Sequence, residues 1–222
     1  MSVTNQLKGV RVAAGVAAPA AVDEPAVVAR VSFHASLHNL LADIQSSHPH
    51  VRTTAWQLAG RVGAVAVQPL AKVVDDGEME VSRAAKRAMW QIVRHVGRPG
   101  GDRKEKDAVV NELLVVLNGT KSVPVRREVV RMLSEIGGDE SVPAVSSLLS
   151  HGDLREDARM TLERIPGEAS LQALKNALNS APKEFKPNLA QSLRARGVKV
   201  QGFPCKKLVP TKQTNVKPLA AR

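Results

Sequence analysis

The sequence has very few aromatic residues, and this scarcity limits the kinds of site that it can build. Its 222 residues include three Phe, two Trp and no Tyr. Proteins that bind single-stranded nucleic acid stack successive bases on aromatic rings, and aromatic side chains also line many ligand pockets. So few rings exclude both kinds of surface, and we expect an aliphatic core.

Cysteine and long apolar runs are also scarce. The single Cys excludes an intrachain disulfide framework and a Cys-rich zinc site. The sequence has no stretch of about 18 consecutive apolar residues, so we expect no transmembrane helix and no membrane partner. Near the N-terminus, two basic residues precede an Ala-rich run that resembles a secretion signal, but Gly15 and Pro19 interrupt this run. We therefore expect a cytoplasmic protein with a flexible leader at residues 1–33.

Positive charge is in excess, because 32 Lys and Arg against 21 Asp and Glu give a net charge of +11. Nearly half of this excess lies in residues 201–222, which hold five basic residues and no acidic one. We interpret this segment as a basic, disordered tail. Such a tail could solubilise the protein or contact nucleic acid without sequence specificity.

One apolar pattern recurs five times along the chain. The copies begin at Val51, Val81, Val125, Leu154 and Phe185, at intervals of 30, 44, 29 and 31 residues. Within each copy the apolar residues form one stripe of a helix with 3.6 residues per turn. A second apolar helix is predicted after each of the first four copies, over residues 64–74, 108–118, 141–150 and 169–179.

A helix pair of this size cannot bury its apolar stripe alone, but stacked pairs share one continuous core. The sequence therefore predicts an all-α fold, an α-solenoid of stacked antiparallel helix pairs over residues 34–200. The second unit is longer than the first by 14 residues, and its extra residues predict a long exposed loop over residues 95–107. An extension of the first helix to His95 is the alternative at the start of this loop. We further expect Gly63, Gly137 and Gly197 to end first helices in the left-handed conformation.

Residues 125–145 read VRREVVRMLSEIGGDESVPAV. This pattern resembles the short HEAT-like repeat of the phycobilisome-lyase type, and the resemblance spans about three quarters of the chain. It implies a solenoid that presents an extended surface to partners, and it says little about activity. We predict no cofactor. Bilin lyase subunits share the repeat, so an accessory role in a bilin-lyase-like enzyme is one alternative.

Candidate partner-binding residues lie opposite the apolar stripe of the first helices. They are two Trp and four Arg: Trp56, Arg83, Arg87, Trp90, Arg127 and Arg131. Stacking would bring equivalent positions of neighbouring repeats side by side and form a basic patch. Each Trp is either an anchor for a partner or a ring that lies flat between two first helices under an Arg side chain. The basic residues taken alone fit a solvated face.

Four of the six His lie within 17 residues, at positions 34, 38, 48 and 50. His34 and His38 share a helix face and could hold a metal with a third ligand from the His48–His50 turn. We favour exposed histidines near a terminus and predict no metal site. The second helices carry no His that could serve a nucleophile as a base, so we predict no catalytic residue.

These observations favour a non-enzymatic scaffold that binds a protein partner through its extended surface. The alternative from another class is a nucleic-acid-binding solenoid that uses the basic face and the tail. A steep dependence of affinity on salt would distinguish the second hypothesis from the first.

Overall fold

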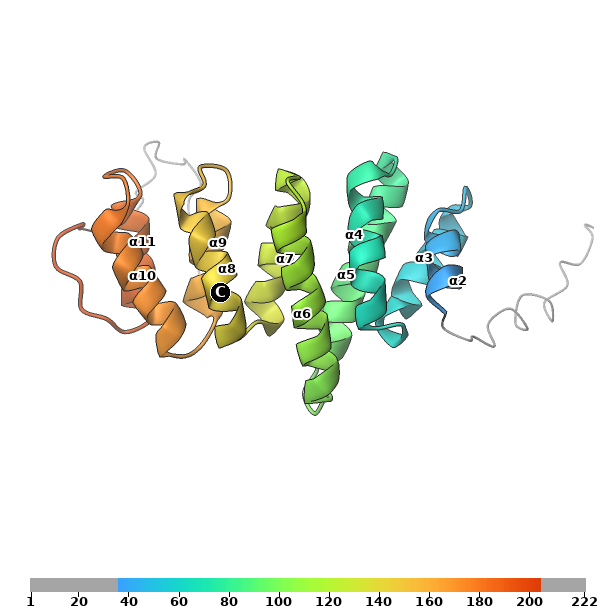
Figure 1. Cartoon of the computed structure of the whole chain (residues 1–222), viewed down its shortest axis with the longest axis horizontal. Coiled ribbons are helices and arrows are strands. Elements are labelled where there is room, and N and C mark those ends of the chain that lie inside the picture. Colours follow the sequence, from blue (N-terminus) through green and yellow to red (C-terminus); the bar gives the residue numbers. More distant parts are fainter. Residues whose placement is uncertain (1–35, 205–222) are drawn as a thin grey trace, which may run out of the picture. The chain divides into compact units, whose positions relative to one another are not determined.

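The computed structural model describes residues 36–204, in which α-helices follow one another with short connections and no β-strand occurs (Figure 1). The predicted leader and the tail from residue 205 onward lie outside these residues, and so does His34. The helices are α2 (Leu37–Ile44), α3 (Pro49–Leu58), α4 (Val67–Asp76), α5 (Met79–Val96), α6 (Arg103–Gly119), α7 (Val123–Ile136), α8 (Val142–Ser147), α9 (Arg155–Arg164), α10 (Glu168–Ser180) and α11 (Lys186–Ala195).

The helices of residues 36–204 form two stacked rows. The first helices of the repeats make one row, in which α3, α5, α7, α9 and α11 each contact the next. The second helices make the other row, in which α4, α6, α8 and α10 do the same (Figure 1). We call the exposed sides of these rows the first-helix face and the second-helix face. The prediction of an all-α solenoid of helix pairs is confirmed.

Aliphatic side chains fill the space between the two rows. Ile92, Leu113 and Leu133 are fully buried, and Phe185 is the one aromatic ring among the largest fully buried side chains of the described residues. Burying one such Leu or Ile contributes about 1.5–3 kcal/mol to folding. Because each helix pair buries its stripe against its neighbours, the core is continuous along the described repeats.

The long exposed loop predicted for residues 95–107 is wrong at its C-terminal end, whereas the alternative of a first helix that reaches His95 agrees with the structure. Helix α5 continues to Val96, and α6 already begins at Arg103, so only six residues join them. The side chain of Asp102 accepts a hydrogen bond from the Lys104 N–H at 2.8 Å and caps the start of α6. Arg103 and Asp107 add an ion pair at 3.7 Å one turn apart. The extra residues therefore lengthen two helices.

Two of the three predicted left-handed glycines adopt that conformation. Gly63 has φ 74° and Gly197 has φ 80°, whereas Gly137 has φ −69°. Gly137 is needed for a different reason, because a Cβ there would lie 2.6 Å from the Leu133 carbonyl oxygen. The prediction for Gly137 was wrong about the backbone angle, since the constraint there is the close approach of the chain.

Candidate partner-binding site

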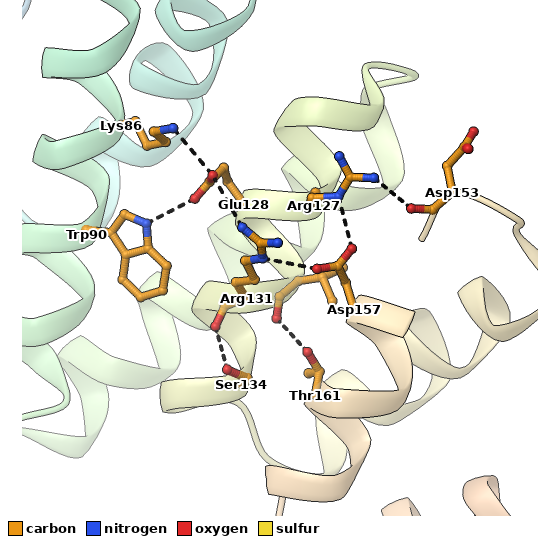
Figure 2. A network of polar contacts seen from close by, with 10 residues as sticks. Lys86, Trp90, Arg127, Glu128, Arg131, Ser134, Asp153, Asp157 and Thr161 are labelled. Atoms are coloured by element: carbon orange, nitrogen blue, oxygen red, sulfur yellow. Dashed lines mark hydrogen bonds and ion pairs between the residues drawn. The ribbon is translucent and has the colours of Figure 1, made fainter. Parts of the chain in front are cut away.

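Arg127 and Arg131 share one carboxylate from the next repeat. Both lie on α7, and their Nε–H groups donate to the two oxygens of Asp157 on α9, each at 3.0 Å (Figure 2). Arg127 also donates to the backbone carbonyl of Asp153 at 2.8 Å. The Asp157 side chain is only 12% exposed, so this pairing is partly shielded from water. It neutralises much of the positive charge expected on α7.

Glu128 on α7 joins this helix to α5, as Asp157 joins α9 to α7. The indole N–H of Trp90 donates to one Glu128 oxygen at 3.1 Å, and Lys86 approaches the other at 3.4 Å (Figure 2). Arg131 lies 4.0 Å from the same carboxylate. Two acidic side chains thus join α5, α7 and α9 along the first-helix face.

Each Trp lies under an Arg side chain. The guanidinium of Arg87 lies 5.8 Å from the ring centre of Trp56, and that of Arg94 lies 5.8 Å from the ring centre of Trp90. These distances fit cation–π contacts. Both rings are half-buried against the core. The indole N–H of Trp56 is buried without a hydrogen-bond partner among the described residues, whereas that of Trp90 is bonded.

The six predicted residues fall into three groups on the first-helix face. Trp90, Arg131 and Arg127 are linked through Glu128 and Asp157, and Trp56 lies with Arg87. Arg83 pairs instead with Glu80 on its own helix at 2.7 Å. The surface of α5, α7 and α9 therefore carries charges of both signs around the Trp90 ring. The assignment of these residues to partner binding remains a proposal.

Two hollows flank the Trp90 ring. One, of about 420 Å³, lies between α5 and α7 and is lined by Trp90, Arg94 and Glu135 among others. The other, of about 320 Å³, lies between α7 and α9 and is lined by Trp90, Arg131, Met160 and Arg164 among others. Met160 is 53% exposed and lies directly beside the Trp90 ring in this hollow. This pair of hollows, centred on Trp90, is the Trp90 site.

Sequence reasoning missed Asp157, Arg94 and Met160. Asp157 follows Arg127 by 30 residues and Arg131 by 26, which is close to one repeat length. Superposing the third and fourth copies would have placed this carboxylate between the two arginines. Met160 was missed because it occupies an offset that carries Arg in the two preceding repeats.

The second-helix face holds a groove of a different kind. It lies between α8 and α10, measures about 670 Å³, and is lined by Ala, Ser, Asn, Gln and aliphatic side chains with Phe185. None of the lining residues is charged. Among residues 36–204, no three His, Cys, Asp or Glu side chains are placed to hold one metal ion. The helices of this part of the chain are also too short or too polar to cross a membrane.

The fold and this surface define an α-solenoid of stacked helix pairs. Residues 110–194 match the family of HEAT repeats. The match supports a HEAT-like repeat protein, and the finer phycobilisome-lyase subtype stays a prediction. A search of curated proteins finds no match to the chain. The matched segment includes α7 and α9, which carry Arg127, Arg131 and Asp157.

Proposed function

We propose that this chain is a non-enzymatic repeat scaffold that binds a protein partner through its first-helix face, with the Trp90 site at the centre. HEAT repeats suggest such a role, because their stacked helices offer an extended surface. The observation that carries the proposal is the exposure of Met160 beside a half-buried Trp ring. Trp and Arg are the residues most enriched among the energetic anchors of protein interfaces.

The composition of the Trp90 site fits a protein partner. Its centre is apolar, with the Trp90 ring and Met160, and its rim carries the charges of Arg131, Asp157 and Arg164. Protein interfaces have this arrangement of an apolar core within a polar rim. The flexible thioether of Met160 can adapt to different apolar side chains.

The charged rim is held in place before a partner arrives. Asp157 fixes Arg127 and Arg131 across the boundary between two repeats. The buried hydroxyl of Thr161 donates to the Val130 carbonyl at 3.0 Å across the same boundary. A surface that is ordered in advance loses little conformational entropy on binding.

The proposal can be tested by capture of partners from an extract of the source cells, with and without nuclease. Met160→Asp should abolish capture of a nuclease-resistant protein, because a charge at the apolar centre is costly to bury. Val115→Asp is the matched control, since Val115 is 51% exposed but lies on α6, where it lines a separate hollow of about 300 Å³ between α4 and α6.

Two results would contradict the proposal. Unchanged capture by Met160→Asp together with loss of capture by Val115→Asp would place binding on the second-helix face. Loss of all captured protein after nuclease treatment would favour the nucleic-acid alternative.

A further inference from the structure

Two arginines of α5, Arg87 and Arg94, differ from Arg83, Arg127 and Arg131 of the same face. Among the described residues, no carboxylate oxygen lies within 4.0 Å of Arg87 or Arg94, and both residues are exposed. Arg83, Arg127 and Arg131 each have such a partner. Around the Trp90 site, the arginine charge that a partner can still neutralise therefore lies on α5.

Arg87 and Arg94 are also the two arginines that lie over the Trp rings. A cation–π contact favours a position of the guanidinium over the ring and leaves its N–H groups available to an acceptor. A guanidinium held in this way loses less side-chain entropy when it binds a carboxylate. The two Trp–Arg pairs are thus preformed positions for anionic groups.

The positions of the two Trp–Arg pairs set the distance between the two anionic groups that they can bind. Arg87 and Arg94 are seven residues apart on one helix, which corresponds to about 10 Å along its axis. Trp90 lies between them on the same exposed side of α5, and it borders both hollows. A cationic hydrogen-bond donor, an apolar pocket and a second cationic donor therefore follow one another along α5.

We propose that the partner contributes an acidic segment that lies along α5. Two of its carboxylates bind Arg87 and Arg94, and an apolar side chain between them enters the Trp90 site. This inference rests on the proposed function and names the chemistry of the partner. The carboxylates of the segment are seven residues apart if it is helical, and three residues apart if it is a polyproline II helix.

The acidic groups around α5 favour a protein segment over a nucleic acid. Glu80, Glu128 and Glu135 belong to the same face, although each is paired with a cation. A nucleic acid duplex carries one charge per about 1.7 Å of its axis, so its phosphates would also meet these carboxylates. A protein segment can place single carboxylates at the two arginines and an apolar group between them.

The experiment is a selection from a phage-displayed library of random 16-residue peptides on the full chain. Selected peptides, made with a fluorescent label, are then titrated by anisotropy against wild-type protein and two double variants. Arg87→Glu/Arg94→Glu reverses the α5 charges. Lys72→Glu/Lys121→Glu makes the same change in net charge at two exposed lysines outside the first helices.

The inference predicts that selected peptides are acidic around an apolar residue. Arg87→Glu/Arg94→Glu should weaken their binding at least about tenfold, and the lysine variant should weaken it less than about threefold. Arg87→Lys/Arg94→Lys should bind more tightly than the charge-reversal variant but less tightly than wild type. It keeps the positive charge and loses the planar guanidinium with its paired N–H donors. Circular dichroism checks that each variant is folded.

Three outcomes would overturn the inference. They are selected peptides without excess acid, no selected peptide at all, or equal weakening by the arginine and lysine variants. In a further outcome, the wild-type chain binds a labelled random 16-mer DNA more strongly than the peptides and loses this binding in Arg87→Glu/Arg94→Glu. That result would show that the partner is a nucleic acid and not an acidic protein segment. If Met160→Asp still abolishes capture of a protein partner in these cases, the proposed function stands and only the chemistry of the partner is wrong.

Discussion

The Nε–H of Arg131 donates to Asp157 at 3.0 Å, and the two residues belong to different repeats. The same carboxylate holds Arg127, so one acidic side chain binds two cations that were expected to be exposed. This relationship explains why the first-helix face has mixed charge although the chain carries +11. It also connects the stability of the solenoid to its surface charge.

Asp157→Asn should destabilise the protein by about 1–2 kcal/mol, because it leaves two arginines without their carboxylate at a partly buried position. The exposure of the Arg127 and Arg131 side chains, at 37% and 52%, keeps the loss below that of a fully buried pair. Asp153→Asn is the control, since among the described residues its carboxylate makes no ion pair and only its backbone carbonyl binds Arg127. Urea unfolding followed by circular dichroism measures both; equal losses would contradict the role of Asp157.

The same pair of variants tests the charge of the surface. Both raise the net charge by one, but only Asp157→Asn releases Arg127 and Arg131 toward solvent. Asp157→Asn should therefore elute from a heparin column at a higher salt concentration than Asp153→Asn. Identical elution would mean that Asp157 does not neutralise these arginines.

The two tryptophans should respond differently to replacement by Phe. Trp90→Phe removes a hydrogen bond to Glu128, whereas Trp56→Phe removes an N–H group that has no partner among the described residues. Both variants lose the same volume, so the difference between them reports the hydrogen bond. Trp90→Phe should cost about 1 kcal/mol more of unfolding free energy than Trp56→Phe. A larger loss for Trp56→Phe would contradict this assignment.

Two buried hydroxyls offer a similar comparison. Thr161→Val keeps the shape of the side chain but removes the bond to the Val130 carbonyl, and should cost about 1–2 kcal/mol. The Ser141 hydroxyl is buried with no hydrogen-bond partner among residues 36–204. Ser141→Ala should therefore change the unfolding free energy by less than about 0.5 kcal/mol or increase it. Thermal unfolding of the two variants measures the difference, and a reversed order would refute it.

One added methyl group should change the stability of the protein in opposite directions at Gly60 and at Gly119. A Cβ at Gly60 would lie 2.8 Å from the Cβ of His95 on α5, so Gly60→Ala should destabilise by about 1–3 kcal/mol. A Cβ at Gly119, the last residue of α6, meets no atom within 4 Å. Gly119→Ala should stabilise by up to about 1 kcal/mol, because Ala favours the helix. The denaturant concentration at the midpoint of unfolding tests the direction of both stability changes, provided that the dependence of the unfolding free energy on denaturant is the same in each variant.

Local patterns predicted the fold because apolar stripes with a helical period leave little choice of packing. The stripe beginning at Val81 predicted α5, and Gly197 follows the end of α11 as expected. Gly63 has the expected positive φ, but α3 already ends at Leu58 and a 3₁₀ turn over Ala59–Arg61 separates the two. The length of α6 was not predictable from composition alone. The charged residues that suggested a loop form the first turns of α6, and Asp102 caps the start of this helix.

The candidate site was predicted only in part, because side-chain partners depend on the register between repeats. Trp90 and Arg131 were identified from their offsets, but the pairing of Trp90 with Glu128 depends on how α5 lies against α7. Arg94 was overlooked because it lies beyond the offsets that the repeats share. Arg94 contacts the Trp90 ring because α5 extends to Val96, which places the two residues one turn apart on the same helix.

The most direct test of the central claim is photo-crosslinking from the two faces of the solenoid. A photoreactive amino acid replaces Met160 on the first-helix face or Val115 on the second, two positions that are about half exposed. Irradiation in nuclease-treated extract of the source cells should yield one defined protein adduct from position 160 and none from position 115. An adduct from position 115 alone, or none from either position, would contradict partner binding at the Trp90 site.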